Sequence, residues 1–96
     1  MTDTVVRRLI KTDGSIEVLG GAMSKTALQI LLCANELDAL NLGTGMVMLA
    51  DIDGIERNLP INPLATEIYH RRANPGANMI HGDVVIVADS DFGGVH

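Results

Sequence analysis

The feature that most restricts the fold is an uninterrupted run of β-branched residues near the end of the chain. The run is Val84-Val85-Ile86-Val87, within a segment that extends from Asp83 to Ala88. Branching at Cβ favours extended backbone, and an apolar run without polar alternation is typical of a strand inside a sheet. The sequence therefore predicts an interior strand over 83–88, for which the remaining segments supply the neighbours.

A β-hairpin is predicted at the start of the chain. The segments 4–10 and 15–19 both carry β-branched residues, and Thr12-Asp13-Gly14 lies between them. Glycine adopts the positive φ that a tight hairpin turn requires, so this tripeptide is a suitable connection.

The middle of the chain predicts further strands. Residues 36–42 alternate only in part between apolar and polar side chains, so a strand is preferred and a helix stays open. Residues 46–50 predict a buried strand after the turn at Gly43-Thr44-Gly45. Asp53-Gly54 then predicts a hairpin turn that returns the chain as a strand over 55–58.

Two helices are predicted from their capping residues. Ser24 is a candidate N-cap for a helix over about 25–35, whose apolar side chains recur at helical spacing. Asn62-Pro63 is the clearest helix start, because proline has no N–H to leave unsatisfied at the first helical position. This second helix extends to about Ala73 and ends before Asn74-Pro75-Gly76.

The predicted order is β-β-α-β-β-β-α-β, an α+β fold with a small mixed or mainly antiparallel sheet of five to six strands and two helices. A length of 96 residues suits a single domain. The polar tail over about 89–96 is expected to fray. Because a core of this size leaves a small stability margin, a homodimer is one way in which such a chain could gain stability.

Charge and cysteine content restrict the classes of partner. The formal net charge is −5, which disfavours direct binding to nucleic acid or to anionic lipid. The single cysteine, Cys33, excludes an internal disulfide and suits a reducing compartment. The apolar runs are shorter than a membrane span and no signal peptide is visible, so we expect a cytoplasmic protein without a membrane partner.

Two short motifs resemble metal-binding sequences but are incomplete. The stretch from Asp51 to Glu56 begins like a calcium loop, but Asn58 and Leu59 occupy the positions of the far ligand. Asp91-Phe92-Gly93 matches the kinase magnesium tripeptide, and the other kinase motifs are missing from the sequence.

The remaining candidates for chemistry are isolated residues. His70, His81 and His96 lack zinc-ligand spacing, although His81-Gly82-Asp83 places donors together at a strand entry. Cys33 falls on the first predicted helix near its apolar stripe, where cysteine is usually a small hydrophobic residue. Ser24 and His70 lack the sequence context of a hydrolase. We therefore predict no catalytic residue, no metal site and no cofactor, and expect that the protein is not an enzyme.

The charge pattern predicts a binding surface. No basic residue occurs between Lys25 and Arg57, and five acidic residues fall in this window: Glu36, Asp38, Asp51, Asp53 and Glu56. If the strands bring these residues together, they form an acidic surface that attracts a basic partner or imitates a phosphate track. An ordinary solvated face is the alternative interpretation.

The opposite charge gathers in Tyr69-His70-Arg71-Arg72, at the end of the second predicted helix. Cations at this end complement the helix dipole, which explains them structurally. The alternative function is that Tyr69 stacks on a base while Arg71 or Arg72 holds a phosphate. The chain would then bind or sequester a nucleotide or signalling molecule, across a dimer interface.

A longer pattern spans two segments of the second half of the chain. These are Leu59-Pro60-Ile61-Asn62-Pro63-Leu64-Ala65-Thr66-Glu67-Ile68-Tyr69 and Ile80-His81-Gly82-Asp83-Val84-Val85-Ile86-Val87, preceded by the pair Leu28-Gln29. With them the chain resembles a family of small proteins common in bacteriophages and mobile elements, catalogued as domain of unknown function 3846. The family often has two glycines after that pair, where this chain has Cys33-Ala34.

The resemblance implies no catalytic residue. Its signature in this chain is Asn62, Ala65, Thr66 and Tyr69, for which a structural role is preferred and a ligand site is the alternative. We therefore expect a non-enzymatic phage accessory protein that works in the bacterial cytoplasm. It would bind a host protein or defence complex through the acidic residues, and modulate or inhibit it.

Overall fold

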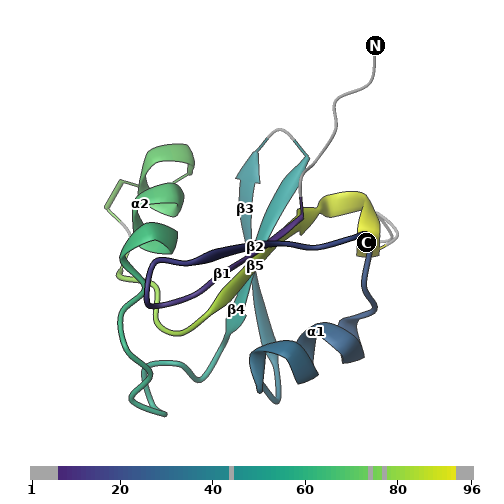
Figure 1. Cartoon of the computed structure of the whole chain (residues 1–96). Coiled ribbons are helices and arrows are strands. Elements are labelled where there is room, and N and C mark those ends of the chain that lie inside the picture. Colours follow the sequence, from purple (N-terminus) through teal and green to yellow (C-terminus); the bar gives the residue numbers. More distant parts are fainter. Residues whose placement is uncertain (1–6, 44, 74, 77, 93–96) are drawn as a thin grey trace.

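The computed structural model describes residues 7–43, 45–73, 75, 76 and 78–92. Its elements are β1 (Arg8–Ile10), β2 (Ile16–Val18), α1 (Lys25–Leu32), β3 (Leu37–Gly43), β4 (Met46–Asp51), α2 (Pro63–Arg72), β5 (Val84–Ala88) and the 3-10 helix η1 (Asp89–Phe92) (Figure 1). The predicted α+β fold is confirmed.

The five strands form one antiparallel sheet in the order β2-β1-β5-β4-β3. The last strand in sequence, β5, therefore lies at the centre. Val85 pairs with Leu9 of β1 on one side and with Leu49 of β4 on the other. All five residues of β5 are buried, so the predicted interior strand is confirmed.

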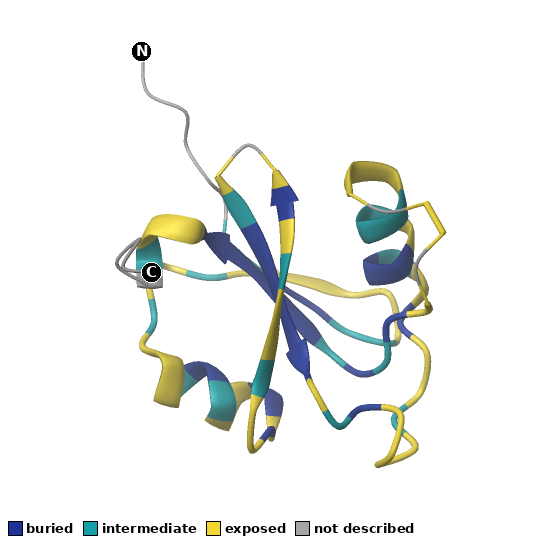
Figure 2. Ribbon diagram, turned by 180° about the vertical axis from the view of Figure 1, so that it is seen from behind, coloured by how far each residue is buried: buried dark blue, intermediate teal, exposed yellow. Residues whose placement is uncertain are grey.

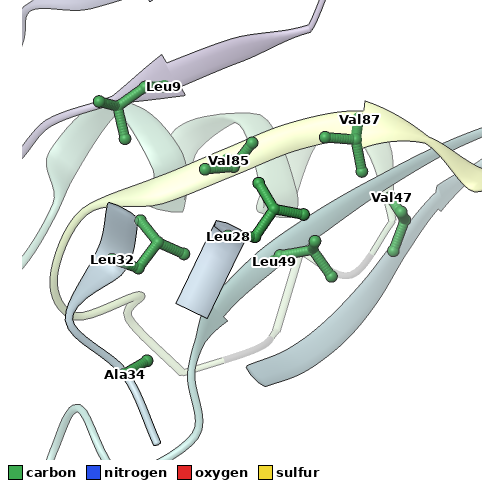
Figure 3. Packing of buried hydrophobic residues seen from close by; sticks show 8 residues of the cluster. All are labelled: Leu9, Leu28, Leu32, Ala34, Val47, Leu49, Val85 and Val87. Carbon is green, nitrogen blue, oxygen red and sulfur yellow. The ribbon is translucent and has the colours of Figure 1, made fainter. Parts of the chain in front are cut away.

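The two helices cover opposite faces of the sheet, which gives three layers (Figure 1). Alternate side chains of a strand point to opposite faces, so each central strand contributes to two cores. The core beneath α1 contains Leu9, Leu28, Leu32, Ala34, Val47, Leu49, Val85 and Val87 (Figure 3). The core beneath α2 contains Ile10, Leu42, Met48, Ala50, Ala65, Ile80, Val84 and Ile86.

Burial is concentrated in the middle of the sheet and decreases toward its edges (Figure 2). The edge strand β2 is exposed along its length, and Ile16 and Val18 are 51% and 68% exposed. Hairpin pairing of Arg8 with Val18 and Ile10 with Ile16 confirms the predicted first hairpin over the described residues. Residues 4–6 of the predicted strand lie outside them.

Both predicted helix caps are present. The Ser24 hydroxyl accepts the N–H of Ala27 at 3.1 Å, and the Asn62 side chain accepts the N–H of Ala65 at 3.0 Å. Helix α1 ends at Leu32, before the predicted end near 35, because Cys33 turns into the left-handed region with φ 53°. Cys33 is exposed at this C-cap, so its predicted place near the buried stripe is wrong.

The predicted strand over 55–58 is wrong. Residues 52–58 form consecutive turns. In them the N–H of Arg57 donates to the backbone carbonyl of Asp53 at 2.9 Å, and the N–H of Leu59 donates to that of Gly54 at 2.9 Å. The physical reason is the sheet order: both edges of β4 are already paired, with β3 and with β5. The segment 36–42, for which a helix stayed open, forms β3 and supplies one of these partners.

A charged pair joins the two ends of the described chain. The Arg7 guanidinium donates from Nε to Asp91 Oδ2 at 2.7 Å and from Nη2 to Oδ1 at 2.6 Å. The Asp91 side chain is only 4% exposed. The first four residues of the tail that was expected to fray thus form η1, and residues 93–96 lie outside the described residues.

The Asp91 pair predicts a specific acid sensitivity. Hydrogen bonds from Arg7 lower the pKa of Asp91 below its ordinary value, because they favour the carboxylate. Its contribution to stability is present above the unfolded-state pKa of about 3.9 and is lost as the pH falls through the lower folded pKa. Urea denaturation across this range should show a steeper loss of unfolding free energy for the wild type than for Asp91→Asn. Parallel curves would contradict the pair's contribution.

Candidate functional site

The family-like signature centres on Asn62, which is 0% exposed. Its Nδ2 donates to the carbonyls of Ile10 and Gly82, both at 3.0 Å, and its Oδ1 caps α2 at Ala65. The amide thus bonds the end of β1, the approach to β5 and the first turn of α2. Both donor positions of the amide are used within the chain, and the burial of the side chain keeps a ligand away from it.

The two family-like segments pack directly on each other. The N–H of Gly82 donates to the backbone carbonyl of Pro60 at 2.8 Å, and the N–H of Ile80 donates to the Thr66 hydroxyl at 2.9 Å. Gly82 has φ +85°, and a Cβ there would lie 2.8 Å from Leu59 Cδ1. Asn62, Ala65 and Thr66 therefore have structural roles, as preferred from the sequence, and of the four signature residues Tyr69 alone lines a groove.

Removal of the Asn62 amide should destabilise the fold strongly. Asn62→Ala loses a helix cap and removes the Asn62 donor from the carbonyls of Ile10 and Gly82, which should cost about 3 kcal/mol of unfolding free energy. The matched control is Ser24→Ala, which removes the exposed cap of α1 and should cost about 1 kcal/mol. Urea denaturation measures both, and equal losses would contradict the bridging role of Asn62.

Asp51, one of the five acids predicted to lie on the surface, is buried. The Asp51 side chain is 2% exposed, forms an ion pair with the Arg57 guanidinium, and accepts the N–H of Asp53 at 2.9 Å. Arg57 also donates to the carbonyl of Cys33 at 2.9 Å, at the end of α1. The prediction of Asp51 as a partner-binding residue is therefore corrected, because Arg57 from the following turn folds back over it.

The other four acids, Glu36, Asp38, Asp53 and Glu56, belong to the start of β3 and the turns after β4. Leu37 pairs with Asp51 in the sheet, and the backbone N–H of Ile52 donates to the backbone carbonyl of Glu36 at 3.2 Å. These two stretches are therefore adjacent. Glu36, Asp38 and Glu56 are exposed and Asp53 is half-buried. Glu36 and Asp38 thus lie next to the start of the turns that carry Asp53 and Glu56, at one end of the β3–β4 hairpin.

Removal of the Arg57 guanidinium should destabilise the fold, because the buried carboxylate of Asp51 then lacks its ion-pair partner. Arg57→Gln leaves that carboxylate without its cation, and should lower the unfolding free energy by about 1–2 kcal/mol, since Arg57 is itself 41% exposed. Adding Asp51→Asn should recover part of the loss in a double-mutant cycle. The control Arg71→Gln breaks the exposed pair with Glu67 at 3.3 Å and should cost less than about 0.5 kcal/mol.

An open groove of about 370 Å³ lies beside these acids. Its walls come from β3, the end of β4 and the turns after it, α2 and the segment before β5. They include Asp38, Leu40, Asp51, Ile52, Ile55, Tyr69, Met79 and His81. Ile52, Ile55 and Met79 are 57%, 62% and 53% exposed. We use the term acidic groove for this groove together with Glu36, Asp53 and Glu56 beside it.

The predicted cluster at the end of α2 is divided by the structure. Tyr69 packs against the core beneath α2 and lines the acidic groove, whereas residues 70–72 do not line it. Arg71 pairs with Glu67 on the exposed side of the helix. Tyr69 therefore borders the same groove as Asp38 and does not form a joint site with Arg71 or Arg72 there.

The histidine and cysteine candidates do not converge. His81 Nδ1 lies 2.9 Å from the carbonyl oxygen of Leu59, and Asp83 accepts the N–H of Thr12 at 3.0 Å, so both hold the backbone. Within the described ranges no three His, Cys, Asp or Glu side chains are placed to hold a metal ion. His96 lies outside those ranges.

The exposed apolar residues of the groove were not predicted as functional. The available signal was that Ile52 and Ile55 flank the turn dipeptide Asp53-Gly54, where residues are ordinarily polar. This signal did not identify Ile55 as a surface residue, because the sequence predicts a strand over 55–58. Met79 had no local signal, since its position depends on the packing of the segment before β5.

Comparison of the chain with protein-family models, with curated proteins and with solved structures finds no match. The resemblance to domain of unknown function 3846 therefore stays a prediction from two segments. Over the residues that the structure describes, no helix has both the length and the apolar character needed to span a membrane.

Proposed function

We propose that this chain is a non-enzymatic binding protein, which attaches through its acidic groove to a basic and partly apolar surface of another protein. The observation that carries the proposal is the juxtaposition of three exposed apolar side chains with four acids. These are Ile52, Ile55 and Met79 beside Glu36, Asp38, Asp53 and Glu56. An apolar patch with a charged border is typical of protein interfaces.

Charge supports a basic partner. The chain has a formal net charge of −5, and no lysine or arginine is among the described residues that line the groove. A surface of one sign accelerates encounter with a partner of the opposite sign and suppresses binding to acidic proteins. The apolar side chains would then supply the desolvated centre of the contact.

The biological setting in this proposal rests on the family resemblance. That resemblance implies a phage-type accessory protein in the bacterial cytoplasm, whose partner would be a host protein or defence complex that is modulated or inhibited. A non-enzymatic role is in keeping with the backbone contacts of His81 Nδ1 and Asp83 Oδ1 and with the ion pair between Asp51 and Arg57.

A small-ligand function is the second candidate, because Tyr69 lines a groove whose volume falls within the range of ligand sites. The acidic wall argues against a nucleotide, since a phosphate would meet Asp38 and not Arg71 or Arg72. A thermal-shift screen against nucleotides tests this candidate. A rise of several degrees in the Tm for one compound would favour it over a protein partner.

Charge reversal should separate the groove from the rest of the acidic surface. In Glu36→Lys/Glu56→Lys the acidic groove loses two carboxylates, whereas Glu17→Lys/Glu67→Lys changes β2 and α2 by the same net charge, and all four residues are exposed. Tagged proteins would be used to capture partners from a bacterial lysate at low salt. We expect about tenfold less of a captured protein with the first variant than with the wild type or the second variant.

The outcome against the proposal is equally concrete. If both double variants retain the same proteins in the same amounts, binding depends on total charge and not on the groove. If Ile55→Asp, which adds an acid but removes an apolar contact, retains the captured protein as well as the wild type does, the apolar part of the proposal fails.

A further inference from the structure

The acidic groove contains an aromatic ring on one wall and a carboxylate on another. Strand alternation places Asp38 on the same face of the sheet as Leu40 and Leu42, which pack in the core region beneath α2. Tyr69 extends from α2 to the same region, and both Asp38 and Tyr69 line the groove. The two side chains therefore border one space from the sheet and from the helix.

The side-chain carboxylate of Asp38 has no hydrogen-bond or ion-pair partner among the described residues. The carboxylates of Asp13, Asp51, Asp83 and Asp91, by contrast, all accept hydrogen bonds within the chain. A carboxylate that borders an apolar groove loses part of its hydration when the groove is filled, so a ligand must offer it a cation or a donor.

We infer that the acidic groove takes a cationic side chain of the partner, an arginine or a lysine, as its anchor between Asp38 and Tyr69. This inference rests on the proposed function and names the chemical group that the groove recognises. A guanidinium or ammonium pairs with the carboxylate and is attracted to the face of the tyrosine ring. The alkyl part of either side chain packs on apolar walls.

The other lining residues suit this ligand. Leu40, Ile52 and Met79 provide apolar contact for the alkyl chain, and a volume of about 370 Å³ accommodates one long side chain with part of its backbone. His81 Nδ1 lies 2.9 Å from the carbonyl oxygen of Leu59, a contact that orients the imidazole ring. The groove thus combines acceptors and apolar walls, without a lysine or arginine among its described lining.

The test uses capped amino acids as probes on the full chain. N-acetyl-arginine amide and N-acetyl-lysine amide would be titrated into the 15N-labelled protein, with N-acetyl-norleucine amide as an uncharged probe of similar length. We expect saturable shifts of the amide signals of residues 38–40, 52–55 and 79–81 with the two cationic probes. The norleucine probe should bind at least about fivefold more weakly, since the charge pair is lost.

Two variants locate the charge that matters. Asp38→Asn should weaken the binding of N-acetyl-arginine amide at least about fivefold, whereas Glu17→Gln, an exposed acid of β2 that lies outside the acidic groove, should leave it nearly unchanged. Tyr69→Leu keeps an apolar residue in the core and should also weaken binding, because the cation–π contact is removed. The amide spectrum of each free variant shows whether it is folded.

The two proposals fail separately. Equal affinity for the norleucine probe, or binding that Asp38→Asn leaves unchanged, would overturn the cationic anchor even if a host protein is captured through the groove. Intact, Asp38-dependent binding of the arginine probe together with no groove-dependent capture would instead count against the host-protein function.

Discussion

The arrangement of this fold depends on the buried amide of Asn62. Its three hydrogen bonds hold the end of β1, the approach to β5 and the first turn of α2 at one point. Because a buried polar group must keep its partners, these segments are fixed relative to one another. The direction in which α2 leaves that point brings Tyr69 over the sheet, so the geometry of the acidic groove follows from a residue outside it.

The second constraint is that both edges of β4 are already paired with other strands. With β3 and β5 on its two edges, the chain that follows Asp51 has no strand to join and must turn away from the sheet. The turns over 52–58 consequently carry Ile52 and Ile55 to the surface beside the start of β3. An apolar pair that a further strand would have packed is therefore exposed next to acids, which is the basis of the proposed binding surface.

The same turns also determine which of the acidic side chains has a cationic partner. Arg57 is the first cation after the acidic window of the sequence, and the turns bring it back onto Asp51, where it neutralises the most buried of the five acids. Asp38, on the opposite face of the sheet by strand alternation, has no such partner in the part of the chain that is described. Of two aspartates in adjacent strands, one thus holds the fold and the other is available to a ligand.

Local chemistry by itself determined the elements that carry their own signals. The run Val84–Val87 determined the interior strand, the Ser24 and Asn62 caps determined the helix starts, and Asp13-Gly14 determined the first turn. Each depends on backbone preferences within a few residues. Only the tertiary structure decided that residues 55–58 do not form a strand and that Asp51 is buried. These outcomes depend on which strand edges and ionic partners are already occupied, and that is a property of contacts between segments distant in sequence.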